Sequence, residues 1–391
     1  MKIVIDGTPI KPNPSGVGLH LMNLIQWLYI LQDHNDLKLC YEMGISYQPG
    51  LKNWFKGKLA FPDLISSYSN LYSLPLPVRT LNPFLLHAPN LFCNLFESSL
   101  DFPDIIHGTN FLVYPFKKSL KILNIYDLTF LKYPQYVNSV VKKYGQIVKQ
   151  CLTWTDLVIS SSESVKQDII QHLDFPPDRI YVTPLASRYD HKYIENLNCE
   201  ILISSFTRYH FSKPYILFVS TIEPRKNIIT LITAFNLLKQ KYKVDHDLVL
   251  IGQKGWNYES IFDAIANSPY QKNIYHLDYL SDELVAIFYS KADVLAYPSH
   301  YEGFGLPILE AMIFNTPVVT SNISSMPEVA GDAALLINPN EPEELAEAIL
   351  KTISDRNLRN DLVAKGQERA KLFSWEKTAL GTLEAYKKVL R

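Results

Sequence analysis

The clearest hydrophobic pattern lies in the second half of the chain. Continuous apolar runs alternate there with longer stretches in which apolar residues recur at helical spacing. The runs predict strands at about 215–220, 247–252, 273–277, 293–297 and 317–320. The stretches between them predict helices at about 227–240, 258–266, 282–290 and 307–314. Because strands that are apolar along their whole length are covered on both faces, the pattern predicts a parallel sheet between helices.

The first half shows a similar but less regular alternation. It opens with a strand at about 2–7 and an amphipathic helix at about 17–31, followed by a strand at about 37–43. Residues 44–100 are rich in Pro and aromatic residues and show no sustained period. Beyond them the pattern predicts strands at 104–107, 121–126, 156–160 and 179–182, with helices at about 138–152 and 163–172. This half is therefore expected to form a second α/β domain.

The alternation predicts two Rossmann-like, doubly wound parallel-sheet domains that face a cleft. The first spans residues 1–190, and a polar segment without a clear period at 191–213 links it to the second at 214–374. A chain of 391 residues is long enough for two domains of ordinary size. Three helices at about 341–353, 356–372 and 375–390 end the chain.

Composition favours a packed enzyme in a reducing compartment. The net charge is −1 and 47% of the residues are hydrophobic, which gives no support for nucleic acid as a partner. The four cysteines lie far apart and form no CxxC pair, as expected of free thiols. The first apolar run is too short for a signal peptide, and no stretch reaches the ~18–20 apolar residues of a membrane span. We therefore expect a cytoplasmic protein.

Several polar residues and glycines follow predicted strands. In open parallel sheets, ligands bind outside the carboxyl ends of the strands. The residues placed there are Gly16, Gly18, Thr109, Asp127, Thr221, Arg225, Lys226 and Glu302. If the two domains face one another, these residues surround a single cleft.

The segment 301–312 carries the most informative chemistry. Glu302 and Glu310, separated by seven residues, bracket a glycine-containing turn and a proline that can open a helix. The free amides of Phe304, Gly305 and Leu306 would then form an anion site at the positive end of that helix. Carboxylates that accept hydroxyl groups beside a phosphate site indicate a sugar nucleotide. The alternative is an ordinary surface loop with one solvated and one capping glutamate.

Two further groups suit a diphosphate. Gly16 and Gly18 lack side chains, so their amides can approach a phosphate closely, although a simple turn before a helix is the alternative. Leu21 replaces the third glycine of a dinucleotide fingerprint, which counts against an NAD enzyme. Arg225 and Lys226 can stabilise charge on a departing diphosphate, unless they are a solvated basic pair.

The Asp245-His-Asp247 sequence matches a metal-binding pattern of transferases, but its position argues against that role. It precedes a predicted strand and so lies at the end of the sheet opposite to the expected site. We interpret it as a chance match in a helix–strand turn, and no metal is predicted.

Residues 301–312, together with 15–18, 218–227, 292–299 and 326–336, resemble the retaining glycosyltransferase family 4. This family has the two-domain GT-B fold, and its signature is two glutamates separated by seven residues. The resemblance covers nearly the whole chain and is closest to mannosyltransferase-type members. It implies metal-independent, retaining transfer of a hexose from a nucleotide sugar, with GDP-mannose the leading candidate. It also implies that the first domain binds a glycan or lipid-linked acceptor and the second binds the donor.

The resemblance assigns roles to the residues of the segment and its neighbours. Glu310 would bind the ribose hydroxyls and Glu302 the hexose hydroxyls. Sugar and phosphate would contact the amides of Phe304, Gly305 and Leu306. The diphosphate would contact Lys226, Arg225 and the amides of Gly16 and Gly18, and Thr221 would belong to the donor-binding residues. The last helix of GT-B proteins commonly crosses back to the first domain, which would involve residues 375–391 here.

Two departures from the family pattern are present. Many relatives have an arginine where this chain has Ser220-Thr221, which leaves the partner of Arg225 open. Family members usually carry His-Asp where this chain has Tyr126-Asp127, on the reacting face of the donor sugar. A phenol with an ordinary pKa of ~10 cannot replace imidazole as a base. His107, at another strand end, is either a substitute or a structural histidine.

The sequence also fits other functions. The tyrosine substitution permits a non-catalytic sugar-nucleotide binder, and the fold also serves enzymes such as sugar-nucleotide epimerases and phosphorylases. A basic–aromatic cluster of Lys52, Trp54, Phe55, Lys56 and Lys58 would allow weak contact with the inner face of a membrane, or it is a solvated loop.

Overall fold

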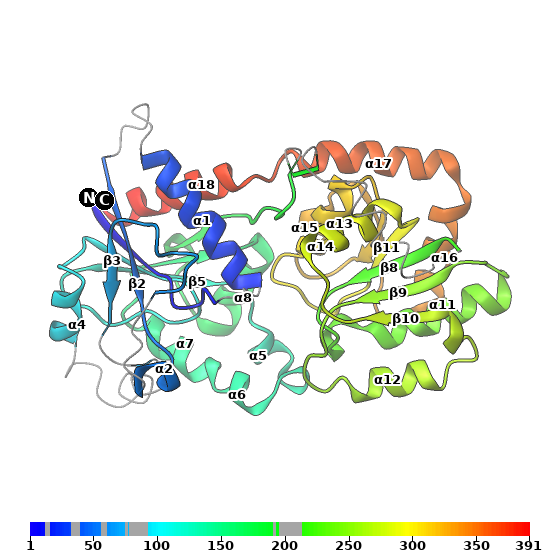
Figure 1. Cartoon of the computed structure of the whole chain (residues 1–391), viewed down its shortest axis with the longest axis horizontal. Helices are drawn as coiled ribbons and strands as arrows, with labels where there is room; N and C mark the ends of the chain where they lie inside the picture. Colours follow the sequence, from blue (N-terminus) through cyan, green and yellow to red (C-terminus); the bar gives the residue numbers. More distant parts are fainter. Residues whose placement is uncertain are drawn as a thin grey trace. The chain divides into compact units, whose positions relative to one another are not determined.

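The computed structural model describes residues 1–11, 16–32, 40–55, 61–74, 77, 93–190, 193–194 and 213–391. The chain divides into two compact units (Figure 1). Unit 1 comprises Met1–Lys132, Ser139–Leu185 and Trp375–Arg391. Unit 2 comprises Tyr133–Asn138 and Ala186–Ser374. The division falls at Leu185, slightly before the boundary expected at residue 190, and most of the expected linker lies outside the described residues.

Unit 1 contains a seven-stranded parallel sheet in the order β3-β2-β1-β4-β5-β6-β7. Its strands are β1 Lys2–Asp6, β2 Glu42–Tyr47, β3 Leu71–Ser73, β4 Ile105–Gly108, β5 Leu120–Ile125, β6 Leu157–Ser160 and β7 Ile180–Val182. Ile5 of β1 lies opposite Ile45 of β2 on one side and His107 of β4 on the other. The strand order reverses between β1 and β4, which is where ligands bind in sheets of this kind.

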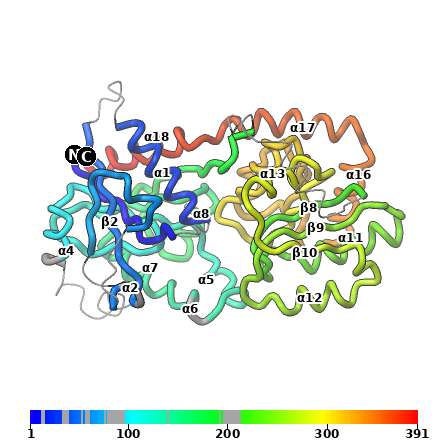
Figure 2. The backbone as a smooth tube through the Cα atoms, in the orientation of Figure 1, coloured from blue at the N-terminus to red at the C-terminus, as the bar shows by residue number. Residues whose placement is uncertain are grey.

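The described helices of unit 1 are α1 Gly16–Gln32, α2 Leu51–Phe55, α4 Cys93–Ser99, α5 Thr129–Lys132, α6 Ser139–Lys142, α7 Tyr144–Leu152, α8 Glu163–Leu173 and α18 Trp375–Val389. Among them, α1, α8 and α18 pack on strands of this sheet. Leu24 and Leu28 of α1 share a core with Ile5 of β1 and with Leu383 and Tyr386 of α18. The last helix of the chain therefore packs beside α1 on the first sheet (Figure 2).

Unit 2 contains a six-stranded parallel sheet in the order β10-β9-β8-β11-β12-β13. Its strands are β8 Tyr215–Val219, β9 Asp247–Ile251, β10 Ile274–Leu277, β11 Val294–Tyr297, β12 Val318–Ser321 and β13 Ala334–Ile337. Its helices are α11 Ile228–Lys241, α12 Glu259–Ala266, α13 Asp282–Lys291, α14 Leu306–Ile313, α15 Met326–Ala330, α16 Pro342–Ser354 and α17 Arg356–Ala370. The order reverses between β8 and β11, so the carboxyl ends of these two strands are the expected ligand position.

Both halves confirm the predicted parallel-sheet α/β architecture, but several local predictions are wrong. The strand expected at about 37–43 is β2, which begins only at Glu42 and contains Gly44. Glycine weakens a strand pattern, yet a Cβ at Gly44 would lie 2.5 Å from the Tyr72 ring, so the close approach of β3 requires it. The single helix expected at 138–152 is two helices, α6 and α7.

Within the described ranges, no helix is both long and apolar enough to cross a membrane. In the proposed membrane-contact cluster, Lys56, Lys58 and the side chain of Lys52 lie outside the described residues. Phe55 is described and exposed.

Candidate functional site

A buried ion-pair cluster lies beyond the carboxyl ends of β8 and β11. Arg225 and Lys226 belong to the 3-10 turn Pro224–Lys226 after β8, and Glu302 follows β11. Glu302 Oε1 accepts hydrogen bonds from Lys226 Nζ at 2.6 Å and from the Tyr297 hydroxyl at 2.8 Å. Glu302 Oε2 accepts one from Arg225 Nη1 at 2.9 Å. One carboxylate thus joins two cations from a neighbouring strand end.

Local backbone geometry holds the two cations in place. Asn227 adopts a left-handed conformation with φ 59°, a conformation that asparagine tolerates, and it ends the turn before α11 begins. Its side-chain amide donates to the carbonyls of Pro298 and Pro339 at 3.0 and 2.6 Å. Arg225 is further fixed by Glu223, whose Oε1 lies 2.9 Å from Arg225 Nη2.

The electrostatics of this cluster keep Glu302 ionised. Burial acts to raise the pKa of Glu302, but Arg225, Lys226 and the hydrogen bonds to it outweigh burial and hold that pKa at about 2. Burial, and then the neighbouring Arg225, lowers the pKa of Lys226, while Glu302 acts in the opposite direction. The positive charges of Arg225 and Lys226 are balanced by Glu302 and Glu223.

A second carboxylate cluster surrounds Glu310 of α14. The Arg188 guanidinium donates to Glu310 through Nε at 3.0 Å and through Nη2 at 3.4 Å, and to Asp282 through Nη1 at 2.6 Å. The Tyr289 hydroxyl donates to Glu310 Oε2 at 2.9 Å. Glu310 is buried, so the bonds that its carboxylate accepts are largely shielded from water.

The loop that leads into α14 has the expected helix-opening geometry. Gly305 precedes the helix with φ +105°, a conformation that side chains other than glycine rarely adopt. Ser325 Oγ lies 2.9 Å from the Glu302 carbonyl and 2.7 Å from the Phe304 carbonyl, so its single O–H can be donated to either and links the loop to Ser325. The amides of Gly305 and Leu306 stand at the helix start, where amides have no intrahelical partner.

The other residues predicted to contact a donor are placed as follows. Thr221 is exposed after β8. Gly16 and Gly18 lie in the first turn of α1, not in a loop before it, because α1 begins at Gly16. Ser15 lies outside the described residues.

The residues predicted for the reacting face lie in unit 1 and are engaged within it. His107 is fully buried, with Nδ1 2.8 Å from the Tyr386 hydroxyl and Nε2 2.7 Å from Asn124 Oδ1. His107 therefore behaves as a structural histidine, the second of the two alternatives given for it. The Tyr126 hydroxyl accepts a bond from Asn124 Nδ2 at 3.1 Å. Asp127 Oδ1 accepts the backbone amide of Thr129 at 2.9 Å, which places this carboxylate at the start of α5.

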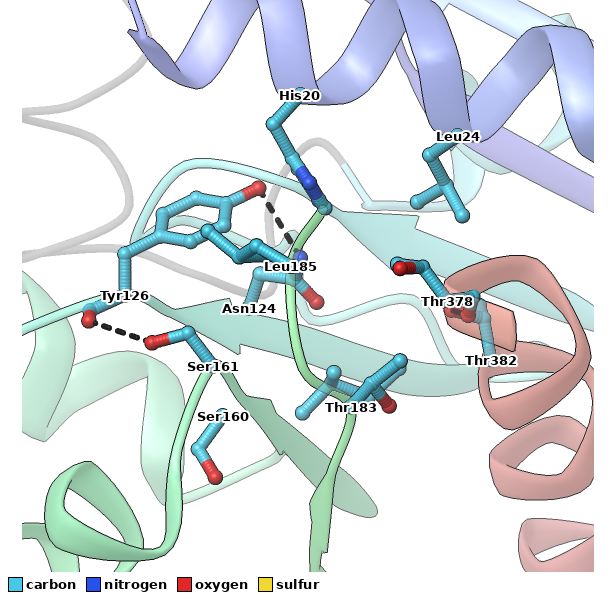
Figure 3. Close-up of a pocket in the computed structure, with 11 residues that line it drawn as sticks. His20, Leu24, Asn124, Tyr126, Ser160, Ser161, Thr183, Leu185, Thr378 and Thr382 are labelled. Atoms are coloured by element: carbon cyan, nitrogen blue, oxygen red, sulfur yellow. Dashed lines mark hydrogen bonds between the residues drawn. The ribbon is translucent and has the colours of Figure 1, made fainter. Parts of the chain in front are cut away.

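Sequence reasoning missed His20, which lies beside Tyr126. Its ring is 5.3 Å from the Tyr126 ring and extends from α1 toward Tyr126 and Asn124 (Figure 3). Among the described residues, neither of its ring nitrogens has a hydrogen-bond partner, and neither does Thr183 Oγ1. The two line a cavity of about 10 Å³, which is close to the space one water needs. Burial lowers the pKa of His20 to about 3, so the imidazole is neutral at pH 7.

Asp245 and Asp247 each contact a neighbouring side chain. Asp245 pairs with Lys213 at 2.7 Å, and Asp247 accepts a bond from Asn273 Nδ2 at 2.7 Å. Asp247 is the first residue of β9, at the end of the sheet opposite to the ion-pair cluster. Within the described part of the chain, no group of three or more His, Cys, Asp and Glu side chains is arranged to hold a metal ion.

Solved structures share this two-domain architecture over almost the whole chain. Sucrose-phosphate synthase from Thermosynechococcus elongatus superposes with a TM-score of 0.74 at 20% identity, covering 100% of this chain and 99% of that one. The Anabaena protein HepE in complex with UDP and glucose superposes with a TM-score of 0.70 at 16% identity, covering 99% of each chain. The fold is thus the GT-B fold of glycosyltransferases.

Sequence comparison identifies the family, whereas the solved structures identify only the fold. Residues 208–369 match the model of the glycosyl transferases group 1 family. The O-antigen chain mannosyltransferase B of Escherichia coli is 32% identical over 391 residues, covering 99% of this chain and 100% of that protein. The chain therefore belongs to the group 1 glycosyl transferases, and mannosyltransferases are among its relatives.

Proposed function

We propose that this glycosyltransferase moves a hexose, with mannose the leading candidate, from a nucleotide sugar to a glycan or lipid-linked acceptor. Transfer proceeds with retention of anomeric configuration and without a metal, as in the glycosyltransferase family 4 that the motifs resemble. Unit 2 binds the donor, and unit 1 binds the acceptor. Acceptors of this kind would place the enzyme in the cytoplasm, in weak contact with the inner face of a membrane.

The observation that carries the proposal is the cluster of Glu302, Arg225 and Lys226 beside the start of α14. Preorganised cations and helix-end amides stabilise an anion that grows in the transition state, which is what departure of a nucleoside diphosphate requires. Sugar-nucleotide binding is in line with the HepE complex, which contains UDP and glucose. The name of the mannosyltransferase B relative supports mannose as the sugar.

The hydrogen bonds that each glutamate already accepts limit which of its carboxylate oxygens can bind a hydroxyl group of the donor. A carboxylate oxygen accepts about two hydrogen bonds. Glu302 Oε1 already accepts from Lys226 and Tyr297, so a hexose hydroxyl would bond to Oε2, which accepts only from Arg225 among the described residues. Glu310 Oε1 accepts only from Arg188 there, so a ribose hydroxyl would bond to this oxygen.

The first experiment is a donor panel of GDP-mannose, UDP-glucose and other nucleotide sugars, measured by calorimetry and by product formation with lipid-linked glycans. We expect GDP-mannose to bind and to give a mannosylated product whose anomeric configuration, determined by NMR, is retained. Binding without turnover would favour a non-catalytic binder, and release of nucleotide without any acceptor would favour an epimerase.

The ribose assignment is tested separately with Glu310→Gln. This change should weaken GDP-mannose binding by about 1.5–3 kcal/mol, the value of a hydrogen bond to a charged group. Glu347→Gln, at an exposed position of α16 in the same unit, is the matched control. Equal affinities of the Glu310 variant and the control would remove Glu310 from the ribose site.

A further inference from the structure

Arg188 lies outside every motif described above, yet it is bound to the carboxylate proposed for the ribose. Its guanidinium reaches Glu310 with two nitrogens and Asp282 with the third. Such a planar fork fixes a carboxylate in both position and orientation, which a lysine cannot do. The sequence pattern gave no signal because Arg188 stands in an aperiodic polar stretch.

The segment that carries Arg188 is firmly held in unit 2. Tyr189 is 2% exposed, and its hydroxyl donates to the Asp282 carbonyl at 2.9 Å. Its ring packs at 5.0 Å from the Phe314 ring and 6.4 Å from the Tyr289 ring. The Arg188 guanidinium lies 5.1 Å from the centre of the same Tyr189 ring. A side chain anchored in this way loses little freedom when it binds Glu310.

Asp282 accepts from the one guanidinium nitrogen of Arg188 that does not face Glu310. Glu310 Oε1 accepts from Arg188 Nε, which leaves it capacity for one more donor. The long contact from Nη2 and the Tyr289 hydroxyl both reach Oε2, so that oxygen is filled. For the described part of the chain, Oε1 is therefore the one oxygen of Glu310 with capacity for a further donor, and Arg188 and Tyr289 fix its direction.

We propose that Arg188 is a positioning residue for the nucleotide: with Asp282 and Tyr289 it orients Glu310 so that Oε1 accepts one ribose hydroxyl. The inference rests on the proposed donor site and adds the residue that determines ribose recognition there. Arg188 acts through Glu310 and does not itself contact the hydroxyl. The ligand class is a nucleoside diphosphate with a ribose, and the site discriminates against deoxyribose.

The test measures how much a ribose hydroxyl contributes to the nucleotide affinity of each variant. GDP, UDP and ADP are titrated calorimetrically against the full chain, each with its 2′-deoxy and 3′-deoxy forms. In the wild type, loss of one hydroxyl should weaken binding by about tenfold. In Arg188→Met, the intact nucleotide should bind about tenfold more weakly, and loss of that hydroxyl should then have almost no further effect. Arg188→Lys should restore only part of the discrimination.

Two controls separate this role from a merely structural one. Arg359→Met removes a comparable half-buried arginine, paired with Asp293 at 2.7 Å in the same unit, and should leave ribose discrimination intact. Asp282→Asn keeps Arg188 but removes its second partner, and should reduce discrimination without abolishing it. Circular dichroism and thermal unfolding establish that each variant is folded.

The possible outcomes are distinct. Undiminished ribose discrimination in folded Arg188→Met would overturn the positioning role, and so would tighter nucleotide binding, which would mean that Arg188 occupies the ribose position. If Arg188→Met cannot be folded, Arg188→Lys with wild-type discrimination overturns the role equally. If no nucleotide binds the wild type, or if the wild type itself ignores the ribose hydroxyls, the proposed donor site is wrong instead.

Discussion

The ion-pair cluster makes a specific prediction for the variant Glu302→Gln. The amide keeps the size of the carboxylate but removes its charge, which leaves Arg225 and Lys226 with Glu223 as their nearby carboxylate. Loss of one partner from a buried ion pair typically costs about 3–5 kcal/mol, because the other charge stays buried without compensation. Glu223 still pairs with Arg225, so we expect the lower end, about 3 kcal/mol, at pH 7.

The pH dependence of this loss follows from the pKa of Glu302, which is lowered from 4.5 to about 2 in the folded protein. A carboxyl group with a lowered pKa stabilises the fold above its unfolded pKa, and the contribution disappears as the pH falls toward the folded value. The stability difference between wild type and variant should therefore be constant from pH 7 to about 5. Below pH 4.5 it should shrink as the wild type approaches the variant.

Hydrogen exchange of peptides from β8 and β11, across a urea series, measures this difference within unit 2 alone. A unit-specific readout is needed because a two-domain chain need not unfold in one step. Glu347→Gln, on the exposed face of α16, is the control for removing a negative charge from unit 2. If Glu302→Gln is as stable as this control at pH 7, or if the difference does not change below pH 4.5, the buried ion pairs do not hold this site together.

Three further predictions concern turnover. Lys226→Ala should lower kcat more than it raises KM, because charge on the diphosphate grows toward the transition state; an unaltered kcat would make Lys226 a binding contact only. Transfer should continue in EDTA, and complete loss of activity that manganese or magnesium restores would refute metal independence. Tyr126→Phe should keep most activity and cost about 0.5–1.5 kcal/mol of stability, since its hydroxyl bonds Asn124. A large fall in kcat would instead place that hydroxyl on the sugar.

The sequence predicted the second sheet well because its strands are doubly covered. β8 was expected at 215–220 and spans Tyr215–Val219, with every residue buried. β13 was missed because it is an edge strand of only four residues, so its apolar run is short, and Leu336 within it is exposed. Edge strands bury less surface, and local pattern therefore specifies them weakly.

The sequence predicted where the candidate site lies but not how its side chains pair. The strand-end rule placed Arg225, Lys226 and Glu302 in one region, and the sheet order brings them into contact. The rule could not predict that Glu302 is the counter-ion of both cations, because that pairing depends on β11 lying next to β8. Arg188 and His20 were missed because one stands in an aperiodic stretch and the other interrupts the apolar face of a helix.

The balanced charges of the cluster bear on how a donor could bind there. Glu302 and Glu223 neutralise Arg225 and Lys226, so these two cations attract a diphosphate only weakly. A diphosphate must then bind to the uncharged amides at the start of α14, or displace Glu302 as the partner of Arg225 or Lys226. Glu302→Gln removes the carboxylate partner of Lys226 and one of the two carboxylate partners of Arg225. This variant should therefore bind GDP more tightly than the wild type while it transfers mannose more slowly. Weaker GDP binding together with slower transfer would show that Glu302 serves to hold the cations in place, and not to compete for them.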